Sequence, residues 1–89
     1  MPIIDYGVIK QDVLDSLQRY VEQKIPTGGF LRAVLENNLM EACGRADEQN
    51  SASLFQIVAY VYNELPARSW GSPEKVVAWL EDENVHGRQ

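Results

Sequence analysis

The sequence predicts an all-α protein, a small four-helix bundle-like single domain that covers residues 1–89. In four segments of the chain, apolar residues recur at the three- and four-residue spacing of an amphipathic helix. Pro26, Gly44 and Pro66 follow the first three of these segments, at the positions where helices commonly stop. No run of alternating apolar and polar residues is long enough to indicate a strand.

The first predicted helix covers residues 9–23. Its apolar stripe consists of Val13, Leu14, Leu17, Tyr20 and Val21. Lys24 extends this stripe at the carboxyl end of the helix, where a positive charge suits the helix dipole. The preceding arm, residues 1–8, contains apolar residues that are expected to pack against the domain: Ile3, Ile4 and Tyr6.

The second predicted helix covers residues 28–43 and begins at two consecutive glycines. Thr27 is expected to be its N-cap, because a threonine hydroxyl can accept from a free amide of the first turn. Each glycine inside a helix costs roughly 1 kcal/mol relative to alanine. Gly28 and Gly29 therefore need a reason, which is either crowding of the backbone or a ligand approaching the bare amides.

The apolar face of this second helix is broad, and Asn38 is expected in its middle. A buried asparagine either binds the backbone of a neighbouring loop or reaches into a ligand pocket. Cys43 is expected to be a small buried hydrophobic residue. Gly44 is expected to end the helix in the left-handed conformation.

The third predicted helix begins at Asp47, a good N-cap, and runs to about Leu65. Its apolar arc is wide enough for a central helix touched on two sides, and includes Leu54, Phe55, Ile57, Val58, Val61, Tyr62 and Leu65. The fourth helix begins with Ser72 as N-cap and Pro73 at the first helical position. Its inward residues are expected to be Val76, Val77 and Leu80, with Trp79 at the margin and residues 81–89 fraying.

The net charge of −5, from 13 acidic against 8 basic residues, argues against a general nucleic-acid binder. It leaves room for a small anionic ligand and for docking on a basic partner. The single cysteine excludes a disulfide within the chain and favours a reducing compartment. No segment is long and apolar enough to span a membrane, and no signal peptide is evident. The expected location is the cytoplasm.

Catalytic chemistry is not expected, because the sequence offers no convergent set of reactive groups. The only histidine, His86, falls in the charged tail, and Cys43 has no histidine near it in sequence. No spacing of ligands suggests zinc, calcium or a phosphate-binding loop. We therefore expect no enzyme activity, no metal and no cofactor.

Two helix starts are candidate ligand sites. One is Thr27–Gly29, whose amides could hold a phosphate or carboxylate, with Arg32 one turn on; the alternative is a tight turn between helices. The other is the Arg68–Ser72 loop, where Trp70 offers a stacking ring and Lys75 a cation; the alternative is that Trp70 covers one end of the core. The candidate ligand-binding residues are Thr27, Gly28, Gly29, Arg32, Asn38, Trp70, Ser72 and Lys75.

A string of short signatures across residues 19–80 resembles a group of small uncharacterised proteins of phages and prophages. The signatures are Ile25–Asn37, Gly44–Asp47 with Asn50, Tyr62-Asn63, and Gly71–Lys75 with Trp79-Leu80. The resemblance implies a setting, the cytosol of an infected host cell, and no mechanism.

The sequence thus indicates an accessory binding protein, with two competing hypotheses for its function. In the first, it captures a small anionic ligand such as a nucleotide signal of host defence at its helix N-termini. In the second, it acts on a host protein as an inhibitor or adaptor through its acidic and aromatic surface. A homo-oligomer is compatible with either hypothesis, because self-association would complete so small a core.

Overall fold

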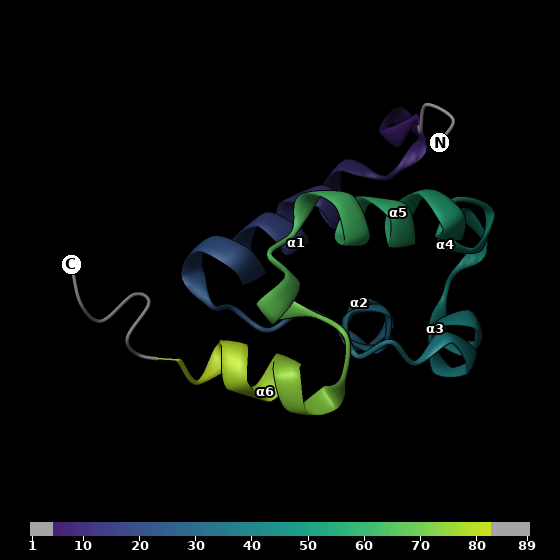
Figure 1. Ribbon diagram of the computed structural model, residues 1–89. Helices are drawn as coiled ribbons and strands as arrows, with labels where there is room; N and C mark the ends of the chain where they lie inside the picture. Colours follow the sequence, from purple (N-terminus) through teal and green to yellow (C-terminus); the bar gives the residue numbers. More distant parts are fainter. Residues whose placement is uncertain (1–4, 83–89) are drawn as a thin grey trace.

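The computed structural model describes residues 5–82, and it confirms the all-α class: these residues form six α-helices and two 3-10 turns (Figure 1). The expectations for Ile3, Ile4, His86 and the tail beyond residue 82 fall outside the described residues. The elements are η1 (Tyr6–Val8), α1 (Gln11–Gln23), α2 (Gly29–Leu35), α3 (Leu39–Arg45), α4 (Glu48–Ala52), α5 (Leu54–Glu64), η2 (Ala67–Ser69) and α6 (Pro73–Leu80).

The second predicted helix is in fact two short helices, α2 and α3, separated by a turn at Asn37 and Asn38. Asn37 has φ 63°, and the amides of Asn37 and Asn38 donate to Val34 and Ala33, which is the hydrogen-bond pattern of a Schellman C-cap. The Asn38 side chain then accepts from the Glu41 amide and caps α3. The prediction that Asn38 lies on a buried helix face is therefore wrong, and its side chain is exposed.

Two further expectations for this segment are also wrong. Gly44 lies inside α3, which continues to Arg45, so the left-handed glycine cap does not form. Cys43 is exposed, because it lies on the outer side of α3, while Ala42 is the residue of α3 that packs inward.

The third predicted helix is likewise divided, into α4 and α5, at Ser53. Asp47 is the N-cap of α4 as predicted, and its carboxylate accepts from the Asn50 amide at 2.7 Å. The Ser53 hydroxyl donates to the Gln49 carbonyl, a back-bond that bends helices and accounts for the break.

The core forms where α1 packs against α2, α5 and α6. It is built from Ile9, Val13, Leu17, Tyr20, Leu31, Leu35, Ile57, Val61, Leu65, Val76 and Trp79. At its centre, the Tyr20 hydroxyl donates to the Ser69 carbonyl at 2.7 Å, and the Trp79 indole donates to the Tyr20 carbonyl at 3.0 Å. These two hydrogen bonds join α1 to η2 and α6, so all three elements depend on one buried tyrosine.

The orientation of α6 differs from the prediction. Trp79 is buried in the core rather than at its margin, and Val77 points outward with 40% of its surface exposed. Trp79 covers Lys24, which ends α1 in the left-handed conformation (φ 59°) with its Nζ 2.9 Å from the centroid of the Trp79 ring. Burial lowers the pKa of Lys24. The expected cation at the end of α1 is present, but it is held under an aromatic ring.

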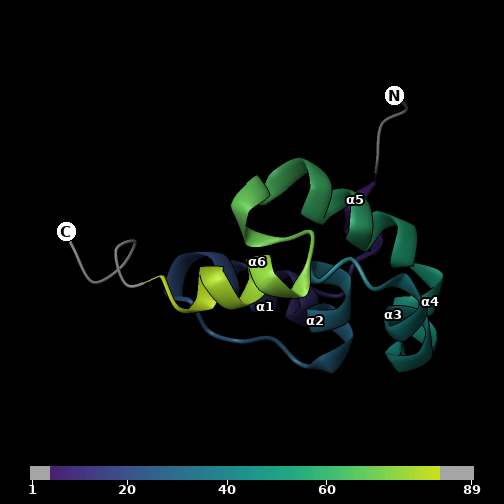
Figure 2. The ribbon, with the colours of Figure 1, turned by 60° about the horizontal axis from the view of Figure 1, so that its bottom comes forward.

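The helices α3 and α4 lie at one end of the molecule in both ribbon views, and the end of α6 lies at the other (Figures 1 and 2). Beside α5, the turn η1 packs through Tyr6, whose ring meets that of Tyr60 edge-on at 5.1 Å. Asn63 donates to the Tyr6 hydroxyl at 3.1 Å. The expected packing of the arm is thus confirmed for Tyr6.

Candidate functional site

Three of the predicted ligand-binding residues, Gly29, Arg32 and Asn38, line one hollow of about 360 Å³ between α2 and α3. The predicted set as a whole does not converge, because its two helix starts lie at opposite ends of α2. Thr27, Gly28 and Gly29 lie at its start. The Trp70–Ser72 loop lies at its other end, where the Gly71 amide donates to the Leu35 carbonyl at 2.7 Å. A helix of seven residues is about 10 Å long, so α2 separates the two groups by that distance. They are two places on the surface rather than one site.

The two glycines at the start of α2 have different surroundings. A Cβ at Gly29 would come within 2.9 Å of the Arg45 guanidinium, which lies over the backbone there. A Cβ at Gly28 would meet nothing within 4 Å, and its φ of −70° suits any residue. Gly28 itself is the N-cap, so the prediction of Thr27 as N-cap is wrong: the Thr27 hydroxyl donates to the Gly28 carbonyl instead. The only close neighbour of Gly29 is the end of a flexible side chain, which can move aside, so crowding of the backbone explains neither glycine.

The cation expected beside this helix start is already paired. Arg32 donates through Nε to Glu36 at 2.6 Å, one turn along the same helix and away from Gly28. Arg45 pairs with Glu41 on α3. Both guanidinium groups are therefore neutralised by neighbours at the four-residue spacing.

At the other helix start, Ser72 is the N-cap of α6 as predicted, and its hydroxyl accepts from the Lys75 amide at 3.1 Å. The Lys75 side chain lies against Gly71, and its Nζ is 5.9 Å from the centroid of the Trp70 ring. Pro73 lacks an amide hydrogen, and Glu74 adds a negative charge to the first turn. This helix start consequently has few donors left for an anion.

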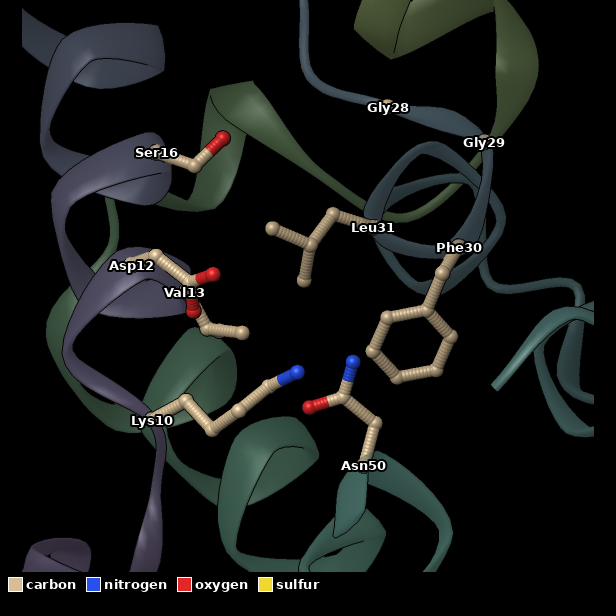
Figure 3. Close-up of a pocket in the computed structure, with 9 residues that line it drawn as sticks. All are labelled: Lys10, Asp12, Val13, Ser16, Gly28, Gly29, Phe30, Leu31 and Asn50. Carbon is tan, nitrogen blue, oxygen red and sulfur yellow. The ribbon is translucent and has the colours of Figure 1, made fainter. Parts of the chain in front are cut away.

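A shallow pocket of about 280 Å³ lies beside the start of α2, between α1 and α4 (Figure 3). Figure 3 shows Asn50 reaching from α4 into the space between Lys10 and Phe30. The Asn50 side chain is 8% exposed, and its Oδ1 has no hydrogen-bond partner among the described residues. Gly28 also lines this pocket, where it places no side chain in the open space.

The charges around this pocket do not favour an anion. Lys10 is the one cation among the pocket residues drawn in Figure 3, but its Nζ is 2.8 Å from the Asp47 carboxylate. The hydrogen bond that Lys10 donates to the Asp47 carboxylate raises the pKa of Lys10 and lowers the pKa of Asp47. Asp12 also lines the pocket, so Lys10 faces two carboxylates. An anionic ligand would meet little net positive charge here.

A second surface, which the sequence reasoning did not select as a site, is an exposed apolar strip along α5. Phe55, Val58 and Tyr62 are 63%, 41% and 66% exposed. Their spacing of three and four residues places them on one side of the helix. Leu39 of α3, 59% exposed, lines a hollow of about 170 Å³ together with Val58. We call these four residues the α5 face.

The α5 face arises because only one side of α5 enters the core. The helix is touched on two sides as predicted, because Ile57 and Val61 are buried in the core and Tyr60 packs against Tyr6 of η1. The apolar arc is wider than these two contacts, so the α5 face remains outside. Trp70 packs against one residue of the α5 face, because its ring centroid lies 5.6 Å from that of Tyr62. The Trp70 indole donates to the Leu65 carbonyl at 3.3 Å. The wide apolar arc of this helix was the sequence signal for the surface.

Within residues 5–82, no group of three or more histidine, cysteine, aspartate or glutamate side chains is arranged to hold a metal ion. None of the helices in this part of the chain combines the length and hydrophobicity needed to cross a bilayer. Searches against protein-family models, curated proteins and solved structures found no match to this chain.

Proposed function

We propose that the protein is a non-enzymatic binding protein that docks another protein chain on the α5 face. The observation that carries this proposal is the exposure of two aromatic and two aliphatic side chains on one uncharged surface. The largest apolar patch on a soluble protein is often a functional one. Aromatic residues are also enriched at the centres of protein interfaces, where they supply much of the binding energy.

The form of the α5 face supports a protein partner over a small molecule. The hollow beside Val58 is small, and the aromatic rings of Phe55 and Tyr62 stand beside it on the same helix rather than around a closed cavity. Small-molecule sites are concave and enclose most of their ligand. A largely convex apolar strip on a helix matches the contact surface of a helix–helix or helix–groove interaction.

The phage and prophage proteins that the sequence resembles provide the setting for this proposal. In that setting the protein is an accessory protein of an infected cell. If the α5 face retains a host protein, the chain acts on it as an inhibitor or adaptor.

The experiment compares three baits in photo-crosslinking and pulldown from bacterial lysate: the wild type, Val58→Arg and Val77→Arg. Val77→Arg is the matched control for Val58→Arg, because both valines lie on helices and are 40% and 41% exposed. We expect the wild type and Val77→Arg to retain the same protein, either a foreign chain or added copies of this one, and Val58→Arg to lose it. Equal retention by all three baits would show that the α5 face does not dock proteins.

The pocket beside α2 supports a second candidate function, the capture of a small ligand. The observation is the buried Asn50 Oδ1 without a hydrogen-bond partner, which a ligand with an N–H or O–H donor would satisfy. Isothermal titration calorimetry tests it with uncharged nucleosides, which carry N–H and O–H donors, and with mononucleotides and cyclic nucleotides as the charged comparison. Binding that is lost in Asn50→Leu and retained in Val77→Arg supports ligand capture, and the absence of heat with every nucleotide rejects nucleotide capture.

A further inference from the structure

We infer that the chain docked on the α5 face is a second copy of this protein, with the two α5 helices antiparallel and the twofold axis near Val58. This inference rests on the proposed function, because it names the partner of the same face. It adds an arrangement that can be tested residue by residue.

The sequence of the face along α5 is self-complementary. An aromatic residue lies at each end, Phe55 and Tyr62, and the smaller Val58 lies between them. Three- and four-residue steps are the spacing of a helix–helix seam. When two such helices run antiparallel about Val58, the Phe55 ring of each copy meets the Tyr62 ring of the other. A twofold interface requires this property, because each surface patch must be its own complement.

The hollow next to Val58 gives the same face both a protrusion and a recess. Val34, Leu39, Ala42 and Val58 supply its apolar lining, and its volume is about 170 Å³. The Phe55 ring projects from the same side of α5 and is 63% exposed. In the antiparallel arrangement the Phe55 ring packs on Tyr62 of the other copy, and the hollow lies beside this seam, where its apolar lining adds to the surface that each copy covers on the other.

Charge also permits this pairing. Each copy carries a net charge of −5, so two copies repel one another over most of their surfaces. The four residues of the α5 face are uncharged, which makes it a surface where copies can meet without placing like charges opposite each other. Screening by salt should therefore strengthen the dimer, whereas docking on a basic foreign partner would weaken with salt.

The area of the face sets the expected affinity. For side chains of this size and exposure, the four residues offer on the order of 500 Å² per copy. Two copies would then bury roughly 1,000 Å² in total, near the lower limit for a specific interface. We therefore expect a weak, reversible dimer that forms at micromolar or higher concentrations.

Sedimentation equilibrium over a range of concentrations tests the inference with five samples. These are the wild type, Val58→Arg, Val58→Glu, an equimolar mixture of these two variants, and Val77→Arg. A charge at position 58 faces the same charge across the twofold axis, so each Val58 variant should dimerise at least ten-fold more weakly. The mixture places arginine opposite glutamate and should recover the dimer. Val77→Arg should behave as the wild type.

A second readout uses the chain's one cysteine. Cys43 is exposed on α3, so donor- and acceptor-labelled copies report self-association by energy transfer. A wild-type dimer, its loss in both Val58 variants and its recovery in the mixture support the inference. A dimer that survives both substitutions, or a mixture that stays monomeric, overturns the antiparallel arrangement.

The outcomes also separate this inference from the proposed function. A wild-type protein that remains monomeric at millimolar concentration overturns the inference of a second copy. If such a monomer still retains a foreign chain that Val58→Arg loses, the α5 face docks proteins and only the named partner is wrong. If Val58→Arg and the wild type retain the same chains, the proposed function fails as well.

Discussion

Tyr20 is expected to be a central determinant of stability, and Tyr20→Phe isolates the contribution of its hydroxyl. The tyrosine is 1% exposed, and its hydroxyl donates at 2.7 Å to the carbonyl of Ser69, a residue with no exposed surface. Phenylalanine keeps the ring beside Trp79 but leaves that carbonyl without its donor. Leaving a buried polar group unsatisfied costs about 1–3 kcal/mol.

Urea unfolding followed by circular dichroism at neutral pH measures this cost directly. In a domain of this size, each kcal/mol lowers the midpoint of thermal unfolding by roughly 4–8 °C, so a melt provides a second measurement. Tyr20→Phe should therefore melt clearly below the wild type with an unchanged helical spectrum. A change in unfolding free energy below about 0.5 kcal/mol would refute the assignment of this hydrogen bond as a structural link.

The same residue predicts a pH dependence at the alkaline end. Burial, the main cause, raises the pKa of Tyr20 from 10.0 to about 12. Between these values the unfolded chain loses the phenolic proton while the folded protein keeps it, so stability falls as the pH rises through this range. The excess stability of the wild type over Tyr20→Phe should shrink across this interval. If the difference stays constant, the phenol is not shielded as the structure indicates.

Four further substitutions test the fold and the face, each by urea unfolding. Phe55→Glu should change the free energy of unfolding by less than about 0.5 kcal/mol, because Phe55 is exposed. Ile57→Ala in the core should lower the free energy of unfolding by about 2–5 kcal/mol. Similar costs for the two substitutions would mean that Phe55 belongs to the core. Gly71→Ala should cost about 1–3 kcal/mol, because Gly71 has φ 123°, and a neutral effect would contradict this conformation. Ser72→Ala should cost about 1 kcal/mol through loss of the α6 cap, and an unchanged stability would argue against the cap.

Periodicity and capping residues predicted the helical class and several helix ends, because these depend on local sequence. Asp47 and Ser72 cap their helices as expected, since each supplies an oxygen to the amide three residues later. The breaks at Asn37 and Ser53 were missed because the apolar pattern continues across them. In both places a polar side chain or a left-handed residue competes with the helix, and period alone does not reveal such competition.

The candidate surface was harder to predict than the fold, because it depends on which part of a wide apolar arc finds a neighbour. The sequence places Phe55 and Ile57 in one broad arc, yet the structure buries Ile57 and leaves Phe55 outside. Only the positions of α1, α2 and α6 around the core decide between them. Gly28 and Gly29 are unusual residues at a helix start, but the side chain that lies over Gly29 belongs to Arg45, which is 16 positions away in the chain. Local sequence does not reveal such a neighbour.

The most direct test of the central claim, that the α5 face binds another protein chain, is a dilution series of ¹H–¹⁵N correlation spectra. The described geometry predicts concentration-dependent shifts centred on Phe55, Val58 and Tyr62, with Leu39 affected across the hollow and Val77 unaffected. Addition of unlabelled Val58→Arg should leave the spectrum of the dilute wild type unchanged. Spectra that do not change from micromolar to millimolar concentration, with no shift of these residues when lysate proteins are added, would contradict the claim.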